Sequence, residues 1–285
     1  MKIGIGLPNH VAGVSGSLVV EWARRAEERG FDCVTTIDRL VYPSVDSIVA
    51  LALAAGASER LELVTNIVLA PLYPTAVLAK QLASVASASG ERLIVGVGVG
   101  SRDDDYRAVD VDFSRRGRLL DDAARMLSAA WRGEPNEDGI PLVPEPVRVP
   151  LLFGGKSAAT LRRATLVGDG WVAGALRDYP VQSAFAEEVR AGWREAGRPG
   201  EPVIHASVNF AIGDTTTLDA GRETLSRYYG FNPDYAALNV ADLVVSAQDV
   251  RDTVRAYSGL GFDRLLFHPT VTGADQVDRL ADAVH

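Results

Sequence analysis

The chain of 285 residues, 47% hydrophobic and 23% charged, is long enough for one large α/β barrel or for two small domains. Its net charge of −8 argues against a nucleic-acid partner, because binding of phosphates needs a basic face. No apolar run reaches the length of a membrane span, so we expect no membrane partner and a cytoplasmic protein. Cys33 is the only cysteine, and the four histidines show no ligand spacing, so we expect neither a disulfide within the chain nor a metal site.

Short apolar runs alternate with amphipathic segments along the chain. Eight of these runs predict strands, at residues 2–7, 31–37, 61–69, 93–97, 151–153, 170–173, 203–212 and 264–267. The segments between them predict nine helices. Those with both limits given lie at 17–29, 157–167, 248–258 and 275–284, and two more contain Leu78 to Val85 and Leu120 to Trp131. The other three begin after a cap at Asp46, begin at Pro180 and lie around Leu225. The run Asp103 to Asp105 predicts a solvated loop.

Residues 133–150 interrupt the alternation. Five of the 14 prolines fall in this segment, so no regular helix is expected there. Two interpretations stay open, a connector between a helix and a strand, and a lid over a site.

Eight strands that alternate with helices, with no composition change to divide the chain, predict a (β/α)8 TIM barrel that spans residues 1–285 as one domain. A doubly wound open sheet is the alternative. In a barrel the catalytic and binding groups come from the C-terminal ends of the strands, so candidate site residues are expected there.

The fourth predicted strand ends in glycines at every second position, Gly96, Gly98 and Gly100, followed by Ser101. A strand end without side chains lets either a ligand or a neighbouring element approach its backbone. A dinucleotide fingerprint is disfavoured, because these glycines follow the fourth strand rather than the first.

Gly154, Gly155, Lys156 and Ser157 follow the fifth strand. Exposed backbone N–H groups, a lysine charge and a serine that caps the next helix together predict an anion-binding cradle at a helix N-terminus. A nucleotide P-loop would need a glycine where Pro150 stands, and a purely structural turn is the other alternative.

Other chemical groups stand at the ends of the first, second and eighth strands. Asp38 either performs chemistry or caps a loop, and Arg39 either binds an anion or pairs with Asp38. His10 and His268 would each transfer protons or serve as ordinary loop residues.

Short motifs run in a fixed order over nearly the whole chain. They are Gly30-Phe-Asp, Asp38, Asp46, Pro71 with Leu-Tyr-Pro74, Ser89-Gly-Glu-Arg-Leu93, Gly96-Val-Gly-Val-Gly100, Phe113 with Arg116-Gly117, Leu151-Leu-Phe-Gly-Gly155 and Asp169-Gly-Trp171. In these motifs the chain resembles the bacterial-luciferase-like family of flavin- or deazaflavin-dependent oxidoreductases. The resemblance implies a TIM barrel that binds FMN or the deazaflavin F420 at its C-terminal rim, and a homodimer.

The resemblance also implies roles for particular residues. A non-prolyl cis peptide would lie at the end of the third strand, where Thr65, Asn66 and Ile67 would form a bulge that backs the cofactor ring. Further along the chain, Gly98, Gly100 and Ser101 would approach the cofactor tail, and Gly154, Gly155, Lys156 and Ser157 would hold its phosphate. Asp38 would hydrogen-bond near the ring, and the catalytic candidates are Asp38, Arg39 and His10.

Two positions depart from the family pattern. The histidine that usually follows the strand-two aspartate in deazaflavin-type members is Arg39 here, which cannot act as a base at neutral pH. The usual arginine two residues before Pro74 is Leu72.

The resulting hypothesis is an F420-dependent oxidoreductase or monooxygenase acting on a small organic substrate, with FMN as the alternative cofactor. A flavin monooxygenase would need a separate flavin or F420 reductase as a partner. Two other hypotheses are a barrel that binds a flavin or phosphate ligand without turnover, and a cofactor-free phosphate-ester hydrolase that uses Asp38 and His268.

Overall fold

Eight parallel strands close into a barrel in the order of the sequence in the computed structural model, which describes residues 1–143 and 145–285. The strands are β1 (Lys2–Gly6), β2 (Cys33–Thr36), β3 (Glu62–Val68), β4 (Leu93–Val97), β5 (Leu151–Gly154), β6 (Gly170–Val172), β7 (Val203–Phe210) and β8 (Arg264–Pro269). Because β8 pairs with β1, the predicted (β/α)8 TIM barrel is confirmed and the open sheet is excluded.

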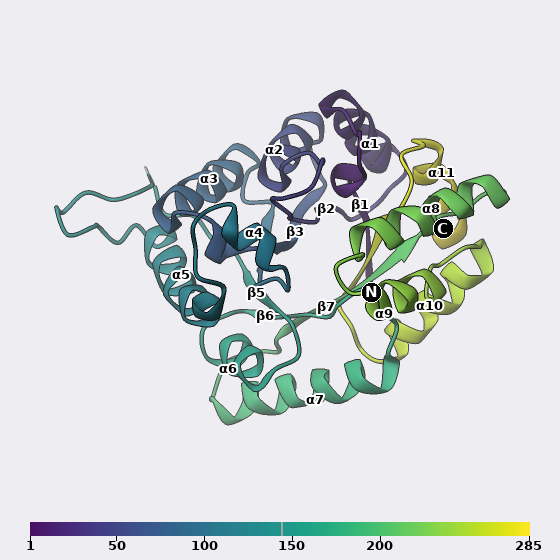
Figure 1. Ribbon diagram of the computed structural model, residues 1–285. Coiled ribbons are helices and arrows are strands. Elements are labelled where there is room, and N and C mark those ends of the chain that lie inside the picture. The colour runs from purple at the N-terminus through teal and green to yellow at the C-terminus, as the bar shows by residue number, and fades with distance from the viewer. Residues whose placement is uncertain (144) are drawn as a thin grey trace.

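Helices surround the strands (Figure 1). They are α1 (Gly16–Glu28), α2 (Ser47–Ala57), α3 (Thr75–Ala88), α4 (Asp103–Arg107), α5 (Arg116–Trp131), α6 (Ala158–Leu166), α7 (Tyr179–Glu195), α8 (Thr215–Tyr228), α9 (Pro233–Ala241), α10 (Ala247–Gly259) and α11 (Asp275–Val284), with 3-10 turns η1 (Pro8–His10), η2 (Ala70–Leu72) and η3 (Phe113–Arg115). Across the described ranges, no helix combines the length and the apolar character that crossing a membrane requires.

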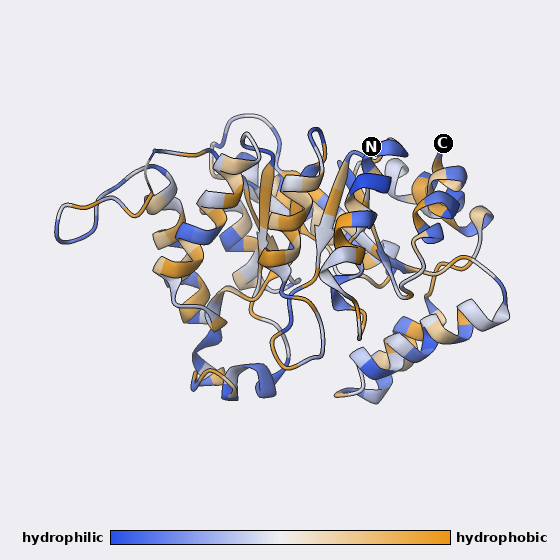
Figure 2. Ribbon diagram, turned by 90° about the horizontal axis from the view of Figure 1, so that it is seen from above, coloured by the Kyte–Doolittle hydropathy of each residue, from blue (hydrophilic) through white to orange (hydrophobic). Residues whose placement is uncertain are grey.

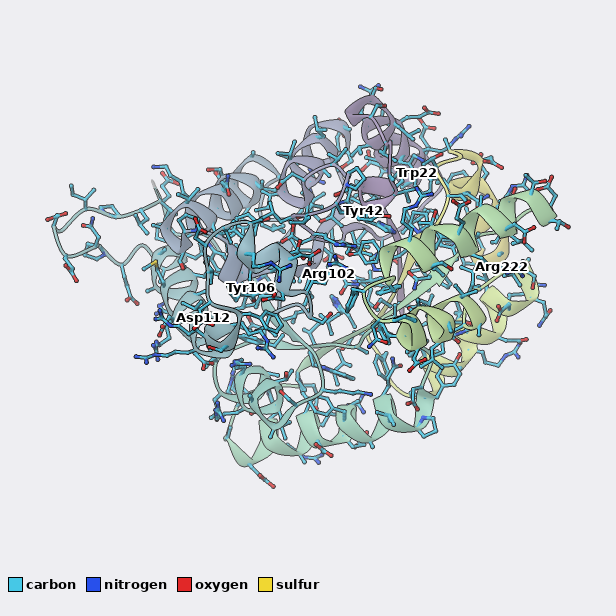
Figure 3. The ribbon with its side chains drawn as sticks, in the orientation of Figure 1. Trp22, Tyr42, Arg102, Tyr106, Asp112 and Arg222 are labelled. Atoms are coloured by element: carbon cyan, nitrogen blue, oxygen red, sulfur yellow. The ribbon has the colours of Figure 1, made fainter. Side chains whose placement is uncertain are left out.

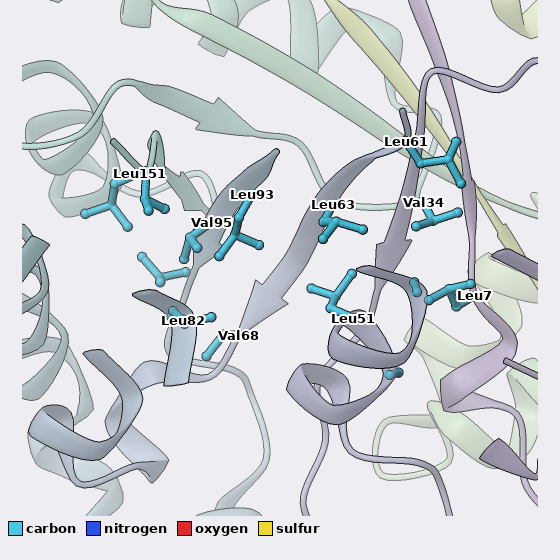
Figure 4. Close-up of a cluster of buried hydrophobic side chains, with 14 of the residues drawn as sticks. Leu7, Val34, Leu51, Leu61, Leu63, Val68, Leu82, Leu93, Val95 and Leu151 are labelled. Carbon is cyan, nitrogen blue, oxygen red and sulfur yellow. The ribbon is translucent and has the colours of Figure 1, made fainter. Parts of the chain in front are cut away.

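The core lies between the strands and the inner faces of the helices. Figure 4 shows Leu51 of α2 and Leu82 of α3 against Leu63 and Val95 of the barrel. Burial of one such leucine stabilises the fold by about 2 kcal/mol. In the hydropathy view the strands are the most apolar elements and the helices alternate between apolar and polar residues, as expected for a ring of amphipathic helices (Figure 2).

The barrel is irregular where β3 ends. The register between β3 and β4 shifts between Thr65 and Val68, and the peptide bond between Asn66 and Ile67 is cis. The bulge and the non-prolyl cis peptide that the family resemblance implied are therefore confirmed at the expected residues.

The prediction of a solvated loop at Asp103 to Asp105 is wrong. These residues open the short helix α4, and Asp105 is only 1% exposed. Its carboxylate accepts a hydrogen bond from the backbone N–H of Val41, at 2.6 Å. The charge run therefore ties the loop after β4 to the loop after β2, a tertiary contact that a local sequence pattern cannot reveal.

The proline-rich segment joins the end of α5 to the start of β5, and Pro144 lies outside the described residues. Pro135 and Pro141 form an isolated antiparallel bridge, and the segment projects from the body of the barrel (Figure 1). A connection from a helix to the next strand lies at the N-terminal end of a barrel, opposite the rim that carries function. The position of this segment thus supports its interpretation as a connector between a helix and a strand and contradicts its interpretation as a lid over the rim.

Candidate functional site

A cavity of about 230 Å³ opens at the C-terminal rim of the barrel. The ends of β2, β3, β5, β6, β7 and β8 and the segment after α8 contribute its lining, namely Ile37, Asn66, Ile67, Gly154, Gly155, Val172, Ala173, Gly174, Ala175, Ser207, Tyr229, Tyr235 and His268. A concave, largely apolar cavity with a few converging polar groups is typical of a small-molecule site. We call it the rim cavity.

Ile67 fills one wall of the rim cavity, and the glycines of β4 and β5 make room for it. A Cβ added at Gly98 would lie 2.0 Å from Ile67 Cδ1, and one added at Gly154 would lie 2.8 Å from the same atom. Gly100 adopts a φ of +66° and faces Leu69, while Ser101 is exposed. Of the two interpretations of the glycine run, close packing of a neighbouring strand is therefore what the structure contains at Gly98.

Two polar groups face each other across the floor of the rim cavity. The side-chain nitrogen Nδ2 of Asn66 lies 2.7 Å from Nε2 of His268. Burial lowers the pKa of His268 to about 3, so its imidazole is neutral at neutral pH and accepts this hydrogen bond. Ser207 donates its hydroxyl to the carbonyl of Ala173, which leaves a neutral, hydrogen-bonding floor.

His10 stands behind His268 rather than in the rim cavity. The centroids of the two rings are 6.0 Å apart and the rings are nearly perpendicular. Burial lowers the pKa of His10 to about 4, and its Nδ1 has no hydrogen-bond partner among the described residues. His10 is thus a neutral imidazole beside His268 and outside the cavity lining, and its catalytic role stays a prediction.

Tyr229 and Tyr235 form the outer wall of the rim cavity, with ring centroids 5.1 Å apart. They come from the segment that ends α8 and begins α9. Arg177, in the loop after β6, binds the other end of α9, because its guanidinium contacts the carboxylates of Asp242 at the C-terminus of α9 and of Asp249 in α10, at 2.9 and 2.6 Å. Burial raises the pKa of both tyrosines, so their hydroxyls are neutral donors at neutral pH.

The predicted cradle adjoins the rim cavity. Ser157 caps α6 by accepting the backbone N–H of Thr160, and Gly155 has the φ of +102° that the turn requires. Gly155, Lys156 and Ser157 are exposed, and Lys156 forms no ion pair with the residues that the structure describes. Free N–H groups at a helix start beside an unneutralised lysine suit a phosphate or another anion.

Asp38 is 7% exposed, and the protein itself supplies its hydrogen-bond partners. Its carboxylate accepts from the hydroxyl of Ser47, at 2.9 Å, the backbone N–H of Leu69, at 2.9 Å, and the hydroxyl of Tyr73, at 3.1 Å. It therefore joins the loop after β2 to the loop after β3 and does not line the rim cavity. These contacts account for Asp38 as an anchor of the rim, and its catalytic role stays a prediction.

Arg39 does not pair with Asp38. Its guanidinium lies over the rings of Tyr42 and Tyr228, 4.5 and 5.0 Å from their centroids, and donates to the backbone carbonyl of Tyr228 at 2.9 Å. In the view of Figure 3, Tyr42 and Arg102 lie between α4 and α8. The guanidinium thus joins the loop after β2 to the end of α8, outside the lining of the rim cavity.

The model of the luciferase-like monooxygenase family matches residues 1–243 of the chain. The chain belongs to this family. Two relatives fit this assignment. An F420-dependent hydroxymycolic acid dehydrogenase of Mycobacterium tuberculosis is 28% identical over 220 residues, which are 69% of this chain and 59% of the relative. An F420-dependent glucose-6-phosphate dehydrogenase of Kribbella flavida is 27% identical over 225 residues, 71% of this chain and 67% of the relative.

Solved structures share the luciferase-like fold over nearly the whole chain. An F420-dependent secondary alcohol dehydrogenase in complex with an F420–acetone adduct has a TM-score of 0.82 at 16% identity, covering 99% of this chain and 98% of the other. A monooxygenase from Streptomyces bottropensis has a TM-score of 0.77 at 20% identity, covering 99% and 96%. At these identities the likeness establishes the fold alone.

For this luciferase-like chain, sequence reasoning located part of the site. Asn66, Ile67, Gly154 and Gly155 line the rim cavity as predicted, while Thr65 is fully buried and donates its hydroxyl to the carbonyl of Gly96. The role of each in binding stays a prediction. The sequence did not indicate the other lining residues, which are Ile37, Val172, Ala173, Gly174, Ala175, Ser207, Tyr229 and Tyr235. The end of a predicted strand could have indicated Val172 and Ala173, but nothing local distinguishes Tyr229 and Tyr235 from other helix residues.

Replacing Asp38 with asparagine should change how stability depends on pH. Burial raises the pKa of Asp38 above its usual 3.8, against the hydrogen bonds it accepts. An acid with a raised pKa in the folded state stabilises the fold below its unfolded pKa and loses that contribution as pH rises through the folded pKa. The difference in free energy of unfolding between the native protein and Asp38→Asn should therefore shrink as pH rises from 4, measured by urea unfolding at several pH values. A difference that grows with pH would contradict this assignment.

Proposed function

We propose that this protein is an oxidoreductase that binds F420, with FMN as the alternative, at the C-terminal rim and acts on a small organic substrate. The observation that carries the proposal is one continuous site, in which the rim cavity and the anion cradle share Gly154 and Gly155 and the bulge at Ile67 forms one wall. The F420-dependent relatives support the choice of F420 first. A homodimer is part of the proposal on family resemblance alone.

The residues present fit a flat, phosphate-bearing cofactor. The cradle from Gly154 to Ser157 would hold the phosphate, because its exposed N–H groups and Lys156 offer charge and donors. Ile67, held by the glycines beneath it, would support the ring, and Asn66 and His268 offer a neutral hydrogen-bonding pair at the floor. When bound, such a cofactor supplies hydride transfer or oxygen activation, which side chains alone do not provide.

The side chains around the rim cavity also limit what the protein can contribute. His268 is a neutral acceptor, Tyr229 is a neutral donor, and neither carries charge at neutral pH. The protein would therefore orient an uncharged reacting group and exclude water, rather than neutralise a charged one. A carbonyl or hydroxyl group is the reacting function that suits these partners best.

A titration of the purified protein with F420 and with FMN, followed by absorbance and by fluorescence quenching, tests the proposal. Tight binding of F420 with weak binding of FMN places the protein among deazaflavin enzymes. The reverse result indicates a flavin monooxygenase that needs a reductase. If neither binds, in oxidised or reduced form, the oxidoreductase proposal fails, and the anion cradle belongs to another ligand.

Lys156→Ala should weaken binding of the preferred cofactor about fivefold to tenfold, because it removes a charge beside the predicted phosphate position. The loss should shrink as salt rises, since screening weakens the native contact as well. Lys80→Ala on the exposed face of α3 is the matched control and should leave the dissociation constant unchanged. Equal effects of the two variants would show that Lys156 contributes only to the overall charge.

A further inference from the structure

A second cavity, of about 250 Å³, lies beside the rim cavity. The loops after β5 and β6 and the first turns of α7 form it, and it shares Gly155, Gly174 and Tyr235 with the rim cavity. Its apolar lining consists of Trp171, Leu176, Val181, Phe185 and Tyr235. We call it the side cavity.

The polar groups in the wall of the side cavity already have partners within the protein. Trp171 donates its ring N–H to the carbonyl of Gly155, at 2.6 Å. Gln182 donates to the carbonyls of Gly174 and Leu176 and accepts from the hydroxyl of Tyr257. A ligand here meets apolar surface rather than free donors and acceptors, so the side cavity selects an apolar occupant.

Two charged residues, Asp178 and Lys156, belong to the described lining of the side cavity. Asp178 caps α7 by accepting the backbone N–H of Val181. Lys156 is exposed and forms no ion pair among the residues that the structure describes. In the cofactor-free protein, an occupant with one anionic end would therefore direct that end toward Lys156, which the proposed function assigns to the cofactor phosphate.

We infer that the side cavity binds an apolar arm of the substrate, an aromatic ring or a short alkyl chain, while the reacting group lies in the rim cavity. This inference rests on the proposed function and adds the substrate class. A cavity of 150 Å³ holds benzene, so one of this size takes an arm of about ten non-hydrogen atoms. Ribityl and phosphate groups of a cofactor are polar, which makes them poor occupants of this wall. Tyr235, which the two cavities share, sets where the arm passes from one to the other.

Straight-chain alkanoates from butanoate to decanoate are suitable probes, with binding measured by calorimetry on the full chain. Each added methylene should tighten binding by up to about fourfold until the side cavity is full, after which the affinity should level off. Affinity that is independent of chain length would overturn the inference.

Val181→Phe places a larger side chain in the side cavity from the third residue of α7. It should abolish the dependence on chain length, so that decanoate binds no more tightly than butanoate. Val77→Phe is the matched control, because Val77 is the third residue of α3, is half exposed and does not line the side cavity. The control should keep the native dependence, and loss of the dependence in both variants would overturn the inference.

Titrations of Val181→Phe with FMN and F420 separate this inference from the proposed function. Both dissociation constants should stay within twofold of the native values. If F420 alone binds more weakly, the side cavity holds the cofactor beyond its phosphate and the inference fails. If the native protein shows the chain-length dependence but binds neither cofactor, the proposed function fails, and so does the assignment of the occupant as its substrate.

Discussion

Gly96→Ala is expected to lower the free energy of unfolding by about 3 kcal/mol, as measured by urea denaturation. A Cβ at this position would lie 2.5 Å from the carbonyl oxygen of Thr65 in the neighbouring strand. This oxygen belongs to the backbone and cannot move aside, because the hydroxyl of Thr65 donates to the carbonyl of Gly96, at 2.7 Å, and ties the two strands together. The same displacement would reach the bulge at Ile67, so cofactor binding should weaken as well.

Gly56→Ala serves as the control for this substitution. Gly56 lies in α2, is exposed, and an added Cβ would have no atom within 4 Å. Alanine in a helix is more favourable than glycine by about 0.5–1 kcal/mol, so this variant should be slightly more stable than the native protein. Similar stability of the two variants would mean that the strand end at Gly96 is more open than the structure indicates.

Acid should destabilise the protein steeply below pH 6.5. Burial lowers the pKa of His10 to about 4, that of His268 to about 3 and that of His205 well below 6.5. The unfolded chain binds these protons near pH 6.5 and the folded chain does not, so the stability present above that pH is lost as pH falls. Each such histidine contributes up to about 1.4 kcal/mol per pH unit to the slope.

His205→Gln tests this slope away from the candidate site, because His205 belongs to β7 and pairs in register with Arg264, the first residue of β8. The slope of the urea midpoint against pH between 6.5 and 5 should decrease, because unfolding of the variant takes up one proton fewer. His285→Gln, at the exposed C-terminal residue, is the control for loss of an imidazole and should keep the native slope. A native protein whose stability does not change over this range would contradict the neutral state assigned to the three histidines.

Local sequence patterns were sufficient to predict most strands and helices of the barrel. The capping residues Asp46 and Ser157, the strand-ending glycines and the alternation of apolar runs depend on contacts within a few residues, so they can be recognised from the sequence. The helices α4 and α9 were not predicted because they are short, with five and nine residues, and such short helices depend on tertiary contacts for their stability.

The sequence by itself determined the eightfold alternation of strands and helices and the family resemblance, since both rest on order and spacing along the chain, and it predicted that candidate groups gather at the C-terminal rim. Only the tertiary structure decided which rim residues share a cavity. Asp38 and Asp105 each join two loops, because they accept hydrogen bonds from the backbone of Leu69 and Val41, which lie 31 and 64 residues away along the chain. Tyr229 and Tyr235 line the cavity because α9 lies at the rim, where Arg177 of the loop after β6 binds Asp242 at the end of this helix. Contacts between segments that are distant in sequence fix these positions, and a linear pattern does not carry that information.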